Sequence, residues 1–261
     1  MVDYHIHCRL SRHGEGELFE YVEAAIRKQL TEIGFAEHIP IPELDDPTGR
    51  MPIEDWAEYV GSLFSAKERY SEITIRFGIE ADYLPSHQPY IAAFVRAYPF
   101  DYVIGSVHFV SDWDFSNMDF RSRLEEFGAK ELYRRYYLLL AEAASSGLYD
   151  VIGHFDLPKR LAPEMPAEMA ALRDAALQAV KRCGLALDVN TSGLRKADDI
   201  YPAPEILAQA FAMDIPITIG SDAHRPEEVA ADFAVTVERL KRIGYRSCLG
   251  FERRKPYRIP L

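Results

Sequence analysis

Seven of the eight histidines lie in or just after short apolar segments, and two carboxylates occur in the same setting. Imidazole nitrogen and carboxylate oxygen together suit zinc, iron or manganese, whereas magnesium and calcium prefer shells of oxygen alone. The sequence therefore predicts a site for several transition-metal ions. The residues concerned are His5, His7, His13, His38, Glu80, His108, His154, Asp222 and His224.

The first pair of histidines has strand spacing. His5 and His7 are two residues apart, so in a strand both imidazoles lie on one face while Ile6 points the other way. The pair alone fits one bound ion about as well as it fits a packed or exposed pair. The return of histidine at later strand ends favours the metal.

Each of the two carboxylates also has a simpler interpretation that involves no metal. Glu80 follows an apolar segment, where burial without a partner is expensive, and a surface salt bridge is the alternative to a metal ligand. Its two oxygens could serve two ions about 3.5–4 Å apart. Asp222 could simply cap a helix ahead of Pro226, but a cap does not explain His224 two residues later.

Two histidines are ambiguous or excluded on local grounds. His13 lies in an expected loop, Ser11-Arg-His-Gly-Glu15, where a solvent-facing histidine is the ordinary interpretation. His87 has no strand end before it and is taken as structural.

The elements that must position these residues alternate along the chain. Apolar strand-like segments alternate with amphipathic helical ones, which implies a parallel sheet, and strands apolar on both faces favour a closed barrel. In such barrels the chemistry lies where strands end. Strands are expected near 2–7, 33–37, 75–82, 102–108, 150–154, 185–190 and 216–221, with a possible short eighth near 246–249. Helices are expected near 18–30, 52–70, 88–97, 121–146, 164–183, 203–213 and 226–243.

Six of the seven expected strands deliver a metal-type residue at their ends. The exception is 185–190, which ends in Asp188-Val-Asn190. The length of 261 residues fits one (β/α) barrel of about 250 residues, and no repeat, linker or composition shift marks a second domain. A single domain over 1–261 is expected.

Composition narrows the class of protein. With 48% hydrophobic and 27% charged residues the chain should be globular, and its formal net charge of −11 argues against general nucleic-acid binding. No membrane-length apolar run or leader-like start is seen, and the three cysteines are far apart. A cytoplasmic protein without disulfides or membrane contact is expected, and the oligomeric state is not indicated.

These motifs as a set resemble the polymerase-and-histidinol-phosphatase (PHP) family of metal-dependent phosphoesterases, nearly from end to end. The matching segments are HIH at 5–7, EH at 37–38, GIEAD at 78–82, GSVH at 105–108, GHFD at 153–156 and GSDAH at 220–224. The resemblance implies a distorted seven-stranded, TIM-like (β/α) barrel that holds up to three divalent ions. It implies a first ion on His5, His7, Glu80 and Asp222, a second on Glu80, His108 and His154, and a third on His13, His38 and His224.

Within the family, the chain looks like the stand-alone histidinol-phosphate phosphatases. The segments that suggest this are HGEG at 13–16, GFAEHIP at 34–40, GIEADYLP at 78–85, GSVHFV at 105–110 and GHFDLPKR at 153–160. The implied reaction is hydrolysis of L-histidinol phosphate to L-histidinol and phosphate, in histidine biosynthesis, by attack of a metal-bridging hydroxide. The alternative is another small phosphate monoester, such as a nucleotide or sugar phosphate. Cys8, Arg9 and Ala36 depart from the family's usual residues next to ligands.

Roles follow for further residues. Glu80, Asp222 and His224 are the expected catalytic residues. Arg160 and Arg195 follow strand ends and are expected to bind the phosphate, since guanidinium groups match phosphate oxygens; loop arginines in solvent are the alternative. Weaker candidates for the phosphate are Arg9, Arg12, Lys159 and Lys196. Unranked candidates for the amine and imidazole are Glu43, Asp45, Asp46, Trp113 and Phe115.

Two other classes compete with this hypothesis. The amidohydrolase barrel also begins with HxH, but it uses a carboxylated lysine near strand four, and no lysine ends a strand here. A metal-stabilised interaction module without turnover is the other; such modules tend to lose ligands, whereas this sequence has the whole set.

Overall fold

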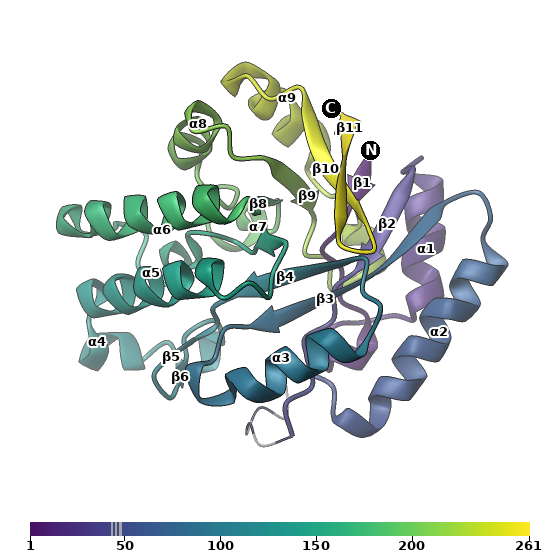
Figure 1. Cartoon of the computed structure of the whole chain (residues 1–261), viewed down its shortest axis with the longest axis horizontal. Helices are drawn as coiled ribbons and strands as arrows, with labels where there is room; N and C mark the ends of the chain where they lie inside the picture. Colours follow the sequence, from purple (N-terminus) through teal and green to yellow (C-terminus); the bar gives the residue numbers. More distant parts are fainter. Residues whose placement is uncertain (43, 45, 47–48) are drawn as a thin grey trace.

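A sheet of seven parallel strands forms the centre of the molecule in the computed structural model, which describes residues 1–42, 44, 46 and 49–261. The strand order, β1-β2-β3-β4-β7-β8-β9, follows the chain, and the helices lie outside the sheet (Figure 1). The bounds are β1 Val2–Asp3, β2 Glu32–Phe35, β3 Thr74–Asp82, β4 Tyr102–Ser106, β7 Val151–Ile152, β8 Ala186–Asn190 and β9 Ile217–Gly220.

The first and last strands of this sheet meet and close a barrel. The segment after β1 continues alongside β9: the Tyr4 amide donates to the Ile219 carbonyl at 3.0 Å, and the His7 amide to the Ala223 carbonyl at 2.9 Å. Ile6 and Ala223 form a parallel bridge. The predicted seven-stranded (β/α) barrel is therefore confirmed.

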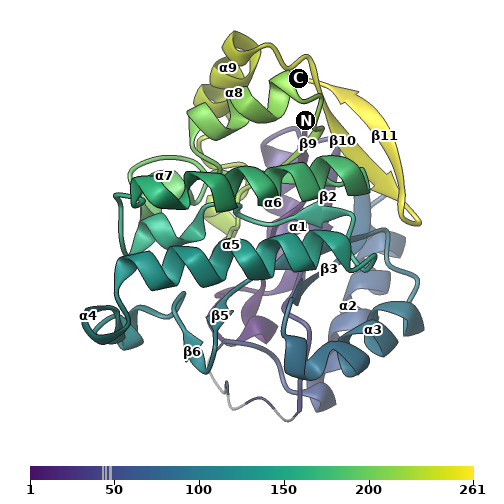
Figure 2. The same cartoon turned by 60° about the vertical axis from the view of Figure 1, so that its left-hand side comes forward.

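Amphipathic helices cover the outside of the barrel. In α1 the residues Leu18, Tyr21, Val22 and Ala25 are buried against the sheet, at the three- and four-residue spacing of one helical face. Figure 2 shows α5 and α6 side by side on one flank. The bounds are α1 Leu18–Arg27, α2 Trp56–Arg69, α3 Gln88–Ala97, α4 Arg123–Phe127, α5 Ala129–Ser145, α6 Ala170–Cys183, α7 Gly193–Lys196, α8 Pro204–Ala212 and α9 Phe233–Ile243.

Two expected elements differ in the structure. The helix expected over 121–146 is divided into α4 and α5 at Gly128, whose φ of +80° interrupts regular helix geometry. The strand expected near 246–249 exists as β10 (Ser247–Glu252), but it pairs with β11 (Lys255–Pro260) in an antiparallel hairpin and does not join the barrel. Positive φ angles at Arg253 and Arg254 form the tight turn between these two strands.

This C-terminal hairpin covers the end of the barrel where the strands begin. The Phe251 amide donates to the Tyr4 hydroxyl, and the Tyr257 hydroxyl donates to Glu32. Arg76 also binds Glu32, at 3.0 Å. The carboxylate of Glu32, paired with Arg76, thus lies under the hairpin. The opposite end of the barrel, where the strands finish, stays open. None of the helices in the described ranges is both long and apolar enough to cross a bilayer.

Two glycines make room for an aromatic ring between barrel strands. Gly78 pairs with Tyr102 across β3 and β4, and a Cβ atom on Gly78 would lie 2.2 Å from Cζ of Tyr102. A Cβ on Gly34 would lie 2.3 Å from the Tyr102 hydroxyl. That hydroxyl donates to the Tyr4 carbonyl at 2.7 Å and is fully buried, so the ring cannot easily move aside.

The variant Gly78→Ala should therefore lower the free energy of unfolding by about 1–3 kcal/mol, the usual cost of overpacking. Gly61→Ala is the matched control: it lies in α2 with nothing within 4 Å of a new Cβ, so it should stabilise by about 0.5–1 kcal/mol. Urea titration followed by circular dichroism measures both. Equal effects of the two variants would contradict the packing described here.

Candidate metal centre

The histidines and acids singled out in the sequence meet at the open end of the barrel. His5 and His7 follow β1, His38 follows β2, and Glu80 lies within β3. His13 lies in the loop that follows His7. His108 follows β4, His154 follows β7, and Asp222 and His224 follow β9. Because parallel strands all finish at the same rim, residues from distant parts of the chain converge there.

Glu80 lies at the middle of this group and is 1% exposed. One carboxylate oxygen, Oε2, faces three imidazole nitrogens: Nε2 of His5 at 3.2 Å, Nδ1 of His38 at 3.2 Å and Nε2 of His7 at 3.4 Å. The other, Oε1, faces two: Nε2 of His154 at 3.1 Å and Nε2 of His108 at 3.6 Å. Ser106 donates to the same oxygen at 2.5 Å. The carboxylate is therefore placed to serve two neighbouring ions.

Several of the histidine nitrogens face one another or have no hydrogen-bond partner. Nε2 of His108 and Nε2 of His154 face each other at 3.1 Å. Nε2 of His5 and Nδ1 of His7 are buried and make no acceptable hydrogen bond within the described chain. Such orphaned nitrogens are costly in a protein interior unless a cation binds them. The donor set thus fits divalent ions of the zinc, iron and manganese type.

Groups of donor atoms within 4.8 Å of one another correspond to two of the expected ion sites. One group corresponds to the first expected ion and another to the second, while His38 joins groups around Glu80 and around Asp82. The four groups are His5, His7 and Asp222; His7, His38 and Glu80; His38, Asp82 and His108; and Glu80, His108 and His154.

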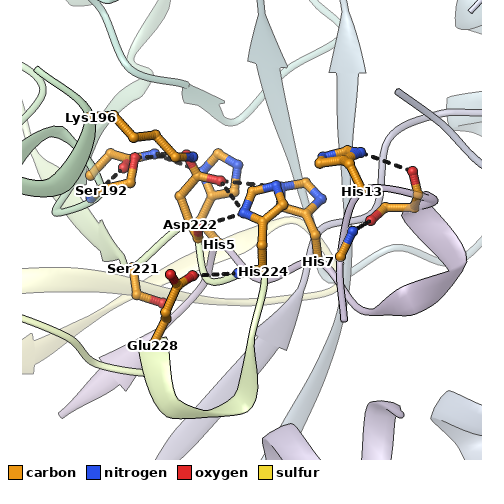
Figure 3. A network of polar contacts seen from close by, with 12 residues as sticks. His5, His7, His13, Ser192, Lys196, Ser221, Asp222, His224 and Glu228 are labelled. Atoms are coloured by element: carbon orange, nitrogen blue, oxygen red, sulfur yellow. Dashed lines mark hydrogen bonds and ion pairs between the residues drawn. The ribbon is translucent and has the colours of Figure 1, made fainter. Parts of the chain in front are cut away.

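The residues expected at a third ion are less tightly gathered. The rings of His13 and His224, both labelled in Figure 3, are 4.6 Å apart, and the rings of His13 and His38 are 5.3 Å apart. Nδ1 of His13 lies 2.9 Å from the Ser11 carbonyl, and Nδ1 of His224 lies 2.8 Å from the Asp222 carbonyl. A carbonyl fixes the proton on Nδ1 and leaves Nε2 free to bind a cation. Burial, with Lys196 nearby, lowers the pKa of His224 to about 3 and so favours the neutral, ligating ring.

Asp222 is held in a strained and highly polar setting. Its φ of 51° lies in the left-handed region, which is uncommon for residues other than glycine. Oδ2 accepts hydrogen bonds from Ser192 at 2.9 Å and Lys196 at 3.3 Å, as drawn in Figure 3. Although burial raises its pKa, the charge on Lys196 and the imidazoles of His5 and His224 hold the pKa of this carboxyl well below its usual range. Asp222 is thus a carboxylate at neutral pH.

Two further buried acids orient metal-type histidines. Asp188 Oδ2 lies 2.8 Å from Nδ1 of His5, and Asp82 Oδ1 lies 2.8 Å from Nδ1 of His108. Such carboxylates fix the ring and leave Nε2 for the ion. Neither acid was predicted from sequence to be functional. The signal was present, because Asp188 lies near the end of the one strand that supplies no ligand, and Asp82 follows Glu80 on the same strand face.

A cavity of about 440 Å³ opens directly beside this group. Arg160 lines it, as expected, and donates to the Ser116 carbonyl at 3.1 Å. Lys196 also lines it. Arg195 is not among the described lining residues: its guanidinium donates to the Ser221 carbonyl at 2.9 Å and lies 3.8 Å from Glu228 and Asp232.

The residues proposed from sequence to bind the amine and imidazole of the substrate also differ in whether they line the cavity. Asp46 lines the cavity but is paired with Arg50 at 2.8 Å. Trp113 and Phe115 are buried in the core and are not among the described lining residues. Glu43 and Asp45 lie outside the described residues.

Removing the charge that orients a ligand should weaken metal binding. We expect Asp82→Asn and Asp188→Asn each to lower the affinity for one ion by about 10–100-fold, because the imidazole loses its orientation and basicity. Metal content measured during competition with a chelator reports this loss. Asp174→Asn, which neutralises a surface acid paired with Arg173, is the control and should leave metal content unchanged. Full retention of metal by both buried variants would contradict the proposed role.

A model of the PHP domain matches residues 3–192 of the chain. The chain is 38% identical over 257 residues to the "Probable histidinol-phosphatase" of Deinococcus radiodurans, with 98% of each chain covered. It is 32% identical to the "Histidinol-phosphatase" of Bacillus subtilis, with 91% of this chain and 98% of that one covered.

A solved structure shares the fold. It is the histidinol phosphate phosphatase of Lactococcus lactis in complex with zinc, L-histidinol and phosphate, with a TM-score of 0.81, 22% identity and 98% of each chain covered. The family model, the near-complete coverage by relatives and the convergence of histidines and acids on one rim agree. The chain belongs to the PHP domain family.

Proposed function

We propose that this protein is a metal-dependent phosphatase that hydrolyses L-histidinol phosphate to L-histidinol and phosphate. The single observation that carries the chemistry is the buried Glu80 carboxylate, with five imidazole nitrogens within 3.6 Å of its two oxygens. The choice of ester is supported by full-length relatives that are named histidinol-phosphatases. A biosynthetic role of this kind fits a cytoplasmic protein.

The metal ligands divide as the family resemblance suggests, with up to three ions. His5, His7, Glu80 and Asp222 would hold the first ion, Glu80, His108 and His154 the second, and His13, His38 and His224 the third. Bound divalent ions supply Lewis acidity, which activates water and neutralises charge on the phosphoryl oxygens.

The chain's own groups bind and orient the phosphate. Lys196, beside Asp222, and Arg160, beside Ser116, bring positive charge to the cavity. Because Arg195 is occupied by a backbone carbonyl and two acids, Lys196 takes the place proposed from sequence for Arg195. Phosphate monoesters carry up to two negative charges, and a guanidinium and an ammonium together match that charge.

The leaving oxygen must receive a proton. Asp222 and His224 both line the cavity and are joined, with Nδ1 of His224 3.5 Å from Oδ1 of Asp222. Either side chain is placed to hold the water that delivers this proton. Ser192 and Lys196 keep the Asp222 carboxylate fixed while it does so.

The variants Glu80→Gln and Asp222→Asn should each lower kcat by at least about 10²–10³-fold, the scale of losing one preorganised electrostatic contact. The amide is nearly isosteric with the acid but is a poor metal ligand. Phosphate release by purified protein, with metal content measured on the same sample, tests this. Near-normal turnover by either variant would exclude the proposed centre.

Metal removal and a substrate panel test the whole proposal. Exhaustive chelation should abolish phosphate release, and zinc, iron or manganese should restore it. L-histidinol phosphate should have the highest kcat/KM in a panel that also contains nucleotide and sugar phosphates. Activity that survives chelation would exclude the metal mechanism, whereas equal or faster turnover of other esters would exclude only the choice of substrate.

A further inference from the structure

Part of the wall of the cavity is a small antiparallel hairpin. Its strands are β5 (Phe109–Val110) and β6 (Trp113–Asp114), and they follow His108 directly. Phe109 and Asp114 are cross-strand partners, and both line the cavity. Cross-strand partners point to the same face of a hairpin, so a flat apolar ring and a carboxylate are presented together.

The carboxylate of Asp114 is bonded on one oxygen only. Oδ1 accepts from the Ser116 amide at 2.9 Å, from the Ser116 hydroxyl at 2.7 Å and from the Asn117 amide at 3.2 Å. These contacts fix the carboxylate in place. Within the described ranges no donor reaches Oδ2, and no Lys, Arg or His forms an ion pair with Asp114.

The other acids that line the cavity are either occupied or exposed. Asp46 is paired with Arg50, and Glu80 and Asp222 belong to the metal centre. Asp119 is exposed to solvent. Among the described lining residues, Asp114 is therefore the acid that is largely buried, fixed by hydrogen bonds and without a cation.

This setting is unfavourable for a carboxylate unless a cation approaches it. Burial raises the pKa of Asp114. The hydrogen bond from the Ser116 hydroxyl and the imidazole of His108 lower this pKa, but they offset the effect of burial only in part. Phe109, Met118 and Leu157 supply apolar lining nearby, and contacts between charges are stronger where water is excluded. A bound ammonium group would remove the penalty.

The charges along the cavity match those of an amino-alcohol phosphate. The metal ligands and Lys196, which lies 3.3 Å from Asp222, attract a phosphate. Asp114 offers negative charge on the part of the wall that Ser116 forms, where Arg160 also reaches the Ser116 carbonyl. We propose that Asp114 binds the ammonium group of the substrate's alcohol and makes the enzyme select phosphate esters of amino alcohols. This inference rests on the proposed function and adds the residue that distinguishes the amine.

The test compares esters that differ only in the amine. The first pair is L-histidinol phosphate and its amine-free analogue, 3-(imidazol-4-yl)propyl phosphate. In the second pair neither ester has an imidazole: 2-aminopropyl phosphate carries the amine, and propyl phosphate does not. Asp114→Asn should lower kcat/KM for the amine-bearing ester by about 10- to 100-fold, the loss expected for a charged hydrogen bond, and leave its amine-free partner nearly unchanged. The change should fall mainly on KM.

Two further variants separate charge from local structure. Asp112→Asn makes the same chemical change in the same hairpin, on an exposed acid paired with Arg123, and should not alter the preference for the amine. Ser116→Ala removes one hydrogen bond to Oδ1 but keeps the charge, and should retain the preference. Matching thermal unfolding temperatures for Asp114→Asn and the parent protein establish that the variant is folded.

The outcomes are distinguishable. Loss of the amine preference in Asp114→Asn, in either pair of esters, supports the inference. An equal decrease for both members of a pair overturns it, because Asp114 would then act only on the shape of the site. If the parent protein does not hydrolyse L-histidinol phosphate, the proposed function fails, and Asp114 is judged on the second pair alone.

Discussion

One buried negative charge, the carboxylate of Glu80, determines how the rest of the molecule is arranged. A carboxylate that is 1% exposed is costly unless hydrogen bonds or cations compensate its charge, and here five imidazoles from four other parts of the chain face it, placed to share cations with it. The barrel makes this possible because six of its seven strands bring metal-type residues to the same rim. The second layer of acids, Asp82 and Asp188, then fixes the rings that Glu80 and the ions require.

Other buried residues hold Asp82 and Asp188 in place and connect them to the rest of the fold. Arg50, which is 5% exposed, donates to Asp82 at 3.1 Å and to the Ile39 carbonyl at 3.1 Å. It thereby connects the segment after β2 to the imidazole of His108 through Asp82. On the other side, Asn190 donates to Asp188 at 3.2 Å and to Asp222 at 3.3 Å, which ties the orienting acid of one histidine to a proposed ligand of the same ion.

Much of this arrangement was predictable from sequence because it depends on periodicity. Apolar segments of strand length located the seven barrel strands. The polar residues at the strand ends, among them His5, Glu80 and Asp222, predicted a metal site and carried the resemblance to the PHP family. Spacing does not report which way a side chain turns after the strand has ended. Arg195 and Lys196 are neighbours in α7, where successive residues differ by about 100° in direction, so only one of them lines the cavity.

The role proposed for Asp114 and the pairing of the C-terminal strand were not predicted, for related reasons. Asp114 lies in a two-residue strand whose role depends on what it faces across the cavity, and no sequence period marks that. The hairpin near 246–249 has an ordinary strand pattern, and only its partner, β11, reveals that it covers the barrel from below. The strand propensity of a segment predicts that it forms a strand, but tertiary packing decides which other strand it pairs with.

The seam between β1 and β9 joins an early and a late segment of the polypeptide: His5 and His7 lie on one side of it, and Asp222 lies on the other. An ion bound by all three residues, as we propose, would hold the two sides of the seam together. Residues 5 to 222 would then have to leave the ribosome before such an ion could bind, and metal supply would become part of the energetics of folding as well as of turnover.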